Sequence, residues 1–232
     1  MSITKYIPNT ITCFNLASGC FATIMALQGD LKAAIIWIII AAIFDFSDGL
    51  AARLLKAYSP LGKELDSLSD IVSFGVAPGM SLYVLLATAV GSSEISGISW
   101  LPYLAFAIPV FSGLRLAKFN VDERQSTSFI GMPVPAHALL WGSLSYVLQP
   151  FITNHALYIL IACLIASMAT SYLLVSEVPM FSMKVKSLKW KGNELRYILI
   201  ACGLLFLLLF GFLGIAGTML LYIILSLFNK QH

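Results

Sequence analysis

The stretch IIAAIFDFSDGLAAR, from Ile39 to Arg53, places two aspartates and an arginine at the end of a long apolar run. A second stretch, GKELDSLSDIVSF, begins at Gly62 and carries Asp66 and Asp70 before it becomes apolar. Ionisable side chains inside membrane helices are costly, so by default they face the interior of the bundle and mark a functional site. The two stretches therefore predict a membrane-spanning fold and also where its chemistry takes place.

The composition is that of a membrane protein. Of the 232 residues, 59% are hydrophobic and only 11% are charged, and the mean hydropathy is +0.90. Soluble domains carry about 25% charged residues. The formal net charge of +3 is small, and no basic run resembles a nucleic-acid-binding patch. A nucleic-acid partner is therefore not expected.

Eight apolar segments are predicted to cross the bilayer, six in a catalytic core and two after it, because short polar or Gly/Pro-rich connections separate them. They lie near residues 11–28, 32–55, 63–90, 100–121, 134–152, 155–175, 195–211 and 214–228. As one helix the last two would span about 48 Å, against a bilayer core of about 30 Å. Two short helices that break around Gly211–Gly214 are therefore preferred to one long span. The predicted fold class is all-α, a polytopic bundle in which residues 1–232 form a single domain.

The placement of basic residues predicts the orientation. With a cytoplasmic N-terminus, only Lys32 of the 14 Lys and Arg residues falls on the outer side, as the positive-inside rule requires. Both termini and the acidic stretches then face the cytoplasm, in an inner membrane of bacterial type. The residues from Met1 to Pro8 are expected to lie along the inner interface as a short amphipathic segment.

The spacing of the four aspartates predicts that they converge. Asp45 and Asp48 are three residues apart and Asp66 and Asp70 are four apart, so each pair shares one face of its helix. The short connection between the stretches predicts antiparallel neighbours, which brings both pairs to the same depth. Such oxygen donors suit Mg²⁺ or Mn²⁺, and two ions about 4 Å apart suit displacement at phosphorus. A cation path in a transporter is the non-enzymatic alternative.

The full spacing, Asp-x2-Asp-Gly-x2-Ala-Arg-x8-Gly-x3-Asp-x3-Asp, resembles the motif of the CDP-alcohol phosphatidyltransferases. Every fixed position of that motif is matched, by Asp45, Asp48, Gly49, Ala52, Arg53, Gly62, Asp66 and Asp70. The resemblance implies that all four aspartates bind two Mg²⁺ or Mn²⁺ ions and that Asp70 also acts as the general base. It also implies a homodimer.

The same resemblance implies a site for the CDP part of the substrate. Gly49 and Ala52 would give the nucleotide room, and Arg53 would pair with phosphate or orient a carboxylate. Family members carry a Pro-Asn-x2-Thr element before the first span, which Pro8, Asn9 and Thr12 match. The residues implied for the CDP part are thus Gly49, Ala52, Arg53, Gly62, Asn9 and Thr12.

The implied reaction joins a membrane lipid to a soluble alcohol. The alcohol attacks the phosphorus of CDP-diacylglycerol that bears the diacylglycerol, and CMP departs. Asp70 takes the hydroxyl proton, because an unassisted hydroxyl is a weak nucleophile.

A second pair of elements bears on which alcohol is used. SGLRLAKFN ends at Asn120, and FIGMPVPA follows from Phe129. Both are similar to elements of the membrane-integral bacterial phosphatidylserine synthases, with Lys118 where Arg is usual and Met132 where Leu is usual. The resemblance implies L-serine as the acceptor.

Serine requires a cation for its carboxylate. Arg115 is the best candidate because arginine forms bidentate pairs, with Lys118 and Asn120 as secondary candidates. Alternatively, Arg115 is an interfacial anchor that reaches lipid headgroups. Glycerol 3-phosphate, inositol phosphate and choline stay open as acceptors, since Arg115, Lys118 and Arg124 could together bind a phosphate.

Overall fold

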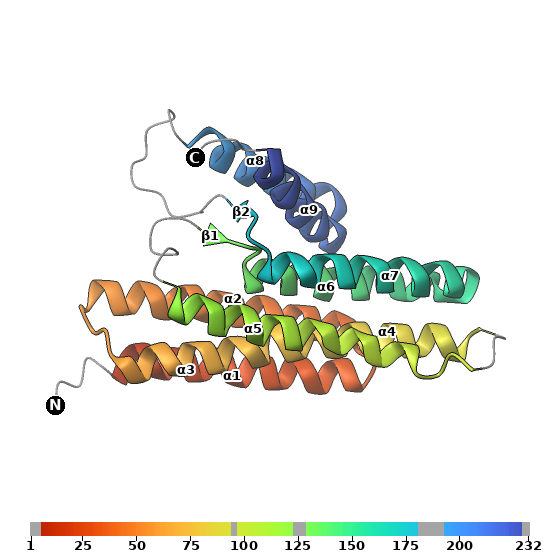
Figure 1. Ribbon diagram of the computed structural model, residues 1–232, viewed down its shortest axis with the longest axis horizontal. Helices are drawn as coiled ribbons and strands as arrows, with labels where there is room; N and C mark the ends of the chain where they lie inside the picture. Colours follow the sequence, from red (N-terminus) through yellow and green to blue (C-terminus); the bar gives the residue numbers. More distant parts are fainter. Residues whose placement is uncertain (1–5, 94–96, 123–128, 181–192, 229–232) are drawn as a thin grey trace.

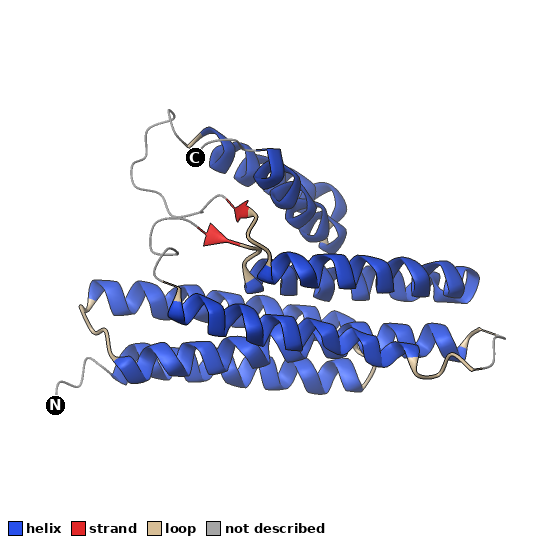
Figure 2. Ribbon diagram, in the orientation of Figure 1, coloured by secondary structure: helices blue, strands red, loops and turns tan. Residues whose placement is uncertain are grey.

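The computed structural model describes residues 6–93, 97–122, 129–180 and 193–228, which are almost entirely helical (Figures 1 and 2). Five helical runs are long and apolar enough to cross a membrane, and Phe212–Phe228 is a shorter apolar helix. The runs are Tyr6–Leu27, Leu31–Leu54, Pro60–Gly91, Leu101–Val121 and Val134–Val175. The prediction of a helical membrane bundle is therefore confirmed.

The first two helices form a hairpin that carries Asp45 and Asp48, two of the four motif aspartates. α1 (Tyr6–Leu27) and α2 (Leu31–Leu54) pack along each other. Gly29 has a φ of +82°, a conformation that suits glycine, and makes the turn. Asp30 then caps α2 by accepting a hydrogen bond from the backbone N–H of Ala33 at 2.9 Å.

The third helical run holds the second acidic pair and changes its winding directly after it. α3 (Pro60–Asp70) begins with a Ser59 side chain that accepts from the N–H of Gly62 at 3.0 Å, and Pro60 occupies its first turn. A π-helix, η2 (Ile71–Val76), follows and continues into α4 (Ala77–Gly91). Wider π turns of this kind often occur at functional sites. Here the change of winding begins one residue after Asp70.

The next part of the chain contributes three α-helices and several short elements to the bundle. Its elements are η3 (Leu101–Phe106), α5 (Ala107–Val121), β1 (Phe129–Ile130), α6 (Val134–Leu148), η5 (Gln149–Phe151), α7 (Ile152–Val175) and β2 (Pro179–Met180). β1 and β2 pair antiparallel, with Ile130 opposite Pro179. The all-α expectation missed this short pair, which joins the segment before α6 to the segment after α7.

The last apolar stretch consists of two helices, α8 (Glu194–Phe210) and α9 (Phe212–Phe228). Gly211, with a φ of +55°, separates them. Figure 1 shows this hairpin inclined to the other helices on one side of the bundle, and α9 packs against α6. The predicted break is therefore present at Gly211.

One local expectation was wrong. Tyr6 to Pro8 form the first turn of α1 rather than a separate interfacial segment, and residues 1–5 lie outside the described part. The predicted break at Thr153-Asn154 is confirmed to within one residue, because the helical backbone is interrupted at η5 and again at His155, whose φ and ψ are −137° and 27°. Proline explains the earlier break, because Pro150 lacks an N–H and disfavours helix in the residue before it.

Two clusters of buried side chains form the core. One includes Phe74, Val134 and Tyr222 and reaches from η2 through α6 to α9. The other includes Leu82 and Trp141 and fills the opposite half of the bundle. The first cluster lies beside the acidic residues and so forms the backing of the site.

Candidate active site

Three of the four predicted aspartates come together between α2 and α3. Asp45, Asp48 and Asp66 each offer a carboxylate oxygen, and these oxygens all lie within 4.8 Å of one another. Asp48 is buried, and the other two are half-buried. α2 and α3 each pack against α1 rather than closely against each other, contrary to the predicted antiparallel neighbours, and α1 holds them so that the aspartates meet between them.

This acidic group fits a divalent cation. Carboxylate oxygens are the donors that Mg²⁺, Mn²⁺ and Ca²⁺ prefer. Three carboxylates this close repel one another in a low-dielectric environment unless a positive charge lies among them. The donor set can therefore hold a metal ion.

Asp70 occupies a different position from the other three aspartates. It is 8% exposed, it neighbours Asp45, and it is not one of the three residues of the acidic group. It lines a pocket of about 110 Å³. The other lining residues are Arg115, Leu116, Phe119, Pro133, Val134 and Pro135. Asp70 thus connects the acidic group to an adjacent pocket.

Arg115 supplies the positive charge of that pocket. It lies on α5 and is 3% exposed, with its guanidinium carbon 5.2 Å from the centre of the Phe119 ring. Its Nε and Nη1 are buried and have no hydrogen-bond partner among the described residues. Buried guanidinium donors without partners are suited to an anion such as a carboxylate. The arrangement favours a ligand site over a headgroup anchor, because an anchor would extend to the surface.

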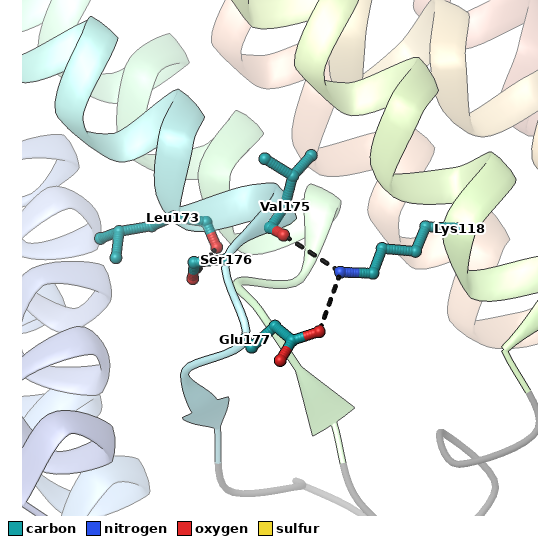
Figure 3. Close-up of polar contacts among 5 residues, drawn as sticks. All are labelled: Lys118, Leu173, Val175, Ser176 and Glu177. Atoms are coloured by element: carbon teal, nitrogen blue, oxygen red, sulfur yellow. Dashed lines mark hydrogen bonds and ion pairs between the residues drawn. The ribbon is translucent and has the colours of Figure 1, made fainter.

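Lys118 is not among the residues that line the pocket, and Figure 3 shows its side chain directed at Val175 and Glu177. Its Nζ donates to the carbonyl of Val175 at 3.3 Å and lies 3.8 Å from Glu177 Oε1. Beside it, the Ser176 hydroxyl donates to the carbonyl of Leu173 at 2.9 Å. Lys118 therefore joins the end of α5 to the end of α7.

Asn120 also bridges two helices and does not line the pocket. Its Nδ2 donates to Ser67 Oγ at 2.8 Å, and its carbonyl accepts from Lys63 Nζ at 3.2 Å. These contacts tie the end of α5 to α3.

The residues expected to contact CDP flank the acidic group on α2. A Cβ added at Gly49 would meet nothing within 4 Å, so the helix surface is open there. Ala52 is half-buried. Arg53 is exposed, and its Nε donates to the carbonyl of Gly49 at 2.9 Å. This side of α2 leaves room for a bulky group beside the aspartates.

The remaining predicted CDP residues lie where α1 meets α2 and α3. A Cβ at Gly62 would come 3.0 Å from Asn9 Oδ1, so glycine permits this close packing. The Thr12 hydroxyl donates to Asp48 Oδ2 at 2.6 Å. Thr12 therefore orients a carboxylate of the acidic group.

The sequence analysis missed Asn15. This residue of α1 is fully buried, and its Nδ2 donates to Asp70 Oδ1 at 3.3 Å. The available signal was a polar amide inside an apolar span, three residues after Thr12 and so on the same helix face.

Comparison with known proteins places this site in a family. Residues 5–170 match the CDP-alcohol phosphatidyltransferase family. The chain is 38% identical over 174 residues to the CDP-diacylglycerol–serine O-phosphatidyltransferase of Bacillus subtilis, an alignment that covers 75% of this chain and 89% of the relative. It is 37% identical over 191 residues to the enzyme of the same name from Mycobacterium leprae, covering 79% of this chain and 60% of the relative.

An archaeal relative carries a different name. The archaetidylserine synthase of Methanothermobacter thermautotrophicus is 34% identical over 142 residues, which cover 59% of this chain and 57% of the relative. The region matched by the family contains the acidic group, Asp70 and Arg115. The chain therefore belongs to the CDP-alcohol phosphatidyltransferase family.

Proposed function

We propose that this protein transfers the phosphatidyl group of CDP-diacylglycerol to L-serine and releases CMP. The observation that carries the proposal is the position of Asp70 between an acidic group and a pocket that contains the buried, unpartnered guanidinium of Arg115. A family member needs a metal-binding group for the pyrophosphate and a separate subsite for the alcohol. The names of the bacterial relatives support serine as that alcohol.

The four aspartates are the proposed ligands of two Mg²⁺ or Mn²⁺ ions. Asp45, Asp48 and Asp66 offer the clustered oxygens, and Asp70 lies next to Asp45. When bound, such ions supply positive charge that stabilises the charge developing on the phosphate oxygens.

The residues of the chain have separate roles in this proposal. Arg115 pairs with the serine carboxylate and so orients its hydroxyl, and Asp70 accepts the hydroxyl proton as the alcohol attacks phosphorus. On α2, the open surface beside Gly49 and Ala52 receives the nucleotide, with Arg53 at its edge. Gly62, Asn9 and Thr12 shape the adjoining wall, where Thr12 also orients Asp48.

The distribution of cations favours serine over a phosphorylated alcohol. Among the described residues, Arg115 is the single Lys or Arg that lines the pocket, because Lys118 and Lys63 bind backbone carbonyls elsewhere. Arg124, the third basic residue considered for phosphate, lies outside the described residues. One guanidinium matches one carboxylate, whereas phosphate recognition usually draws on several cations.

The proposed setting is the inner, cytoplasmic membrane, with eight spans and both termini and the active site on the cytoplasmic side. Residues 1–232 would form one domain, and the family resemblance favours a homodimer. A cytoplasmic opening suits the soluble serine and CMP, while the diacylglycerol tails stay in lipid.

The test is CMP release by the purified protein with CDP-diacylglycerol and Mg²⁺ or Mn²⁺. Serine, glycerol 3-phosphate, inositol phosphate and choline would be supplied separately, with an Asp70→Asn variant alongside. Release with serine, lost in the variant and on chelation of the metal, is the expected result. Release only with another alcohol would overturn the choice of acceptor, and no metal-dependent release with any acceptor would favour cation transport.

A further inference from the structure

Asn15 contacts the proposed general base from inside the first helix. Its side chain is fully buried, and its Nδ2 lies 3.3 Å from Asp70 Oδ1. An ionised carboxylate only accepts hydrogen bonds, so the N–H end of the amide must face Asp70. The opposite end, Oδ1, has no hydrogen-bond partner among the described residues. The polar contact that the amide makes is therefore directed at Asp70.

Two serine hydroxyls hold the backbone of α1 against the Asp70 helix on either side of this contact. Ser69 Oγ donates to the carbonyl of Thr12 at 3.1 Å, and Ser73 Oγ donates to the carbonyl of Asn15 at 2.9 Å. Both serines are fully buried. These bonds fix the position of Asn15 along the helix axis relative to Asp70, because Ser69 is one residue before Asp70 and Ser73 is three residues after it.

The close approach of the two helices continues one turn further along α1. A Cβ added at Gly19 would come 2.6 Å from the Cα of Ser73, so the backbones nearly touch there. Small residues permit this kind of packing between membrane helices. Catalytic groups need to be held to within about 0.5 Å, and rigid elements do this better than loops.

We propose that Asn15 is a positioning residue for Asp70. Its amide holds one carboxylate oxygen, which leaves the other oxygen directed to the pocket where the acceptor hydroxyl binds. This inference rests on the proposed function, in which Asp70 accepts the hydroxyl proton. Partners that orient groups in metal-containing sites are typically worth about 10–100-fold in activity.

A kinetic test compares Asn15→Ala with Asn15→Asp in the full-length protein. Asn15→Ala removes the donor, so kcat for CMP release should fall about 10–100-fold, with the KM for CDP-diacylglycerol changed less than about threefold. Asn15→Asp keeps the shape of the side chain but faces Asp70 with a second carboxylate, so it should be slower than Asn15→Ala. Ser18→Ala is the control, since within the described part of the chain this buried hydroxyl bonds only the carbonyl of Phe14 in its own helix.

Which of the two variants has the lower kcat distinguishes a positioning role of Asn15 from a packing role. If Asn15 only fills space, the isosteric Asn15→Asp should be the milder change, and that order would overturn the proposal. A fall in kcat for Ser18→Ala as large as that for Asn15→Ala would also overturn it.

A second measurement does not depend on activity. The Tm of the wild-type protein, Asn15→Ala, Asp70→Ala and the double variant would be measured in detergent without substrate. Asn15→Ala should lower the Tm in the wild-type background and change it much less when Asp70 is already alanine. The reason is that the stability effects of substitutions at two contacting residues are not additive. Equal shifts in both backgrounds would show that Asn15 does not act on Asp70. This comparison of Tm values needs no CMP release. It therefore tests the contact between Asn15 and Asp70 even if the proposed function is wrong.

Discussion

At the scale of single residues, Arg115 is the residue that we propose selects the alcohol. A guanidinium that is 3% exposed inside a membrane helix, with two donors unpartnered among the described residues, is costly unless an anion binds it. Arginine can pair with a carboxylate through two parallel hydrogen bonds, which lysine cannot. Arg115 therefore contributes both charge and orientation to the proposed serine site.

We expect Arg115→Lys to weaken serine binding selectively. The KM for serine should rise about 10–100-fold, the equivalent of roughly 1.5–3 kcal/mol for a charged hydrogen bond, while the KM for CDP-diacylglycerol changes little. Steady-state CMP release at varied serine concentration measures both constants. Lys118→Gln is the control, because Lys118 contacts Val175 and Glu177 instead of the pocket. An unchanged KM for serine in Arg115→Lys would remove Arg115 from the serine site.

Thr12 provides a second prediction, for the acidic group. Its hydroxyl donates to Asp48 Oδ2 at 2.6 Å, so Thr12→Val removes that donor with little change of shape. The Mn²⁺ concentration for half-maximal activity should rise about tenfold or more. Thr10→Val is the matched control, since Thr10 is exposed and bonds the carbonyl of Tyr6 at 2.8 Å. Equal Mn²⁺ dependence in the two variants would contradict a role for Thr12 in the site.

At the scale of elements, the contact between α1 and η2 holds the site together. Asn15, Thr12 and Gly19 lie on the same side of α1 and meet the helix that carries Asp70. The π-helix begins at Ile71, and its extra width changes which side chains after Asp70 face α1. Ser73 is one of these, and it anchors the carbonyl of Asn15.

Gly19→Val should destabilise this contact. The added side chain meets the Ser73 backbone, so the helices must separate, and overpacking of this kind costs about 1–3 kcal/mol. A lower Tm and a lower kcat are expected together, measured by thermal unfolding and CMP release. Gly91→Val is the control at a helix end where an added Cβ meets nothing within 4 Å. If both variants unfold at the same temperature, the close approach does not limit stability.

At the scale of the whole molecule, the two ends of the bundle differ in chemistry. The connection between α2 and α3 lies at the end that carries the acidic residues, and the connection between α4 and α5 lies at the opposite end (Figure 1). The positive-inside pattern predicts that the first end faces the cytoplasm. Orientation is thus testable with one residue at each end.

We predict that Tyr58 faces the cytoplasm and Ser92 faces outward. Both side chains are exposed. Tyr58→Cys and Ser92→Cys would be made after Cys13, Cys20, Cys163 and Cys202 are replaced by alanine. In right-side-out vesicles a membrane-impermeant maleimide should label the cysteine at 92 and should label that at 58 only after permeabilisation. The reverse pattern would invert the proposed topology.

The C-terminal hairpin packs into the core beside the pocket even though the family match ends at residue 170. Tyr222 and Ile223 of α9 are buried in the same cluster as Val134, which lines the pocket. Helix α9 therefore packs into the same core as a residue that lines the pocket. Spacing within the motif gives no indication of this packing, because α9 lies some 150 residues further along the chain.

By itself, the sequence determined the membrane-helical class and the positions of most helices. The decisive patterns are local: apolar runs about 20 residues long, glycine at the turns, and aspartates spaced three or four apart on one face. Such signals depend on residues within one or two turns of one another. This is why the break at Gly211 was predictable.

The tertiary structure alone decided which polar groups meet. Asn15 and Asp70 are 55 residues apart, Lys118 and Val175 are 57 apart, and neither pairing follows from any periodicity. The same holds for β1 and β2, which pair only because α6 and α7 return their ends to one place. Packing also gives different contacts to the three residues of α5 that were predicted to bind serine. Arg115 lines the pocket, whereas Lys118 and Asn120 join helices, because one helix presents residues only two to five positions apart to different neighbours.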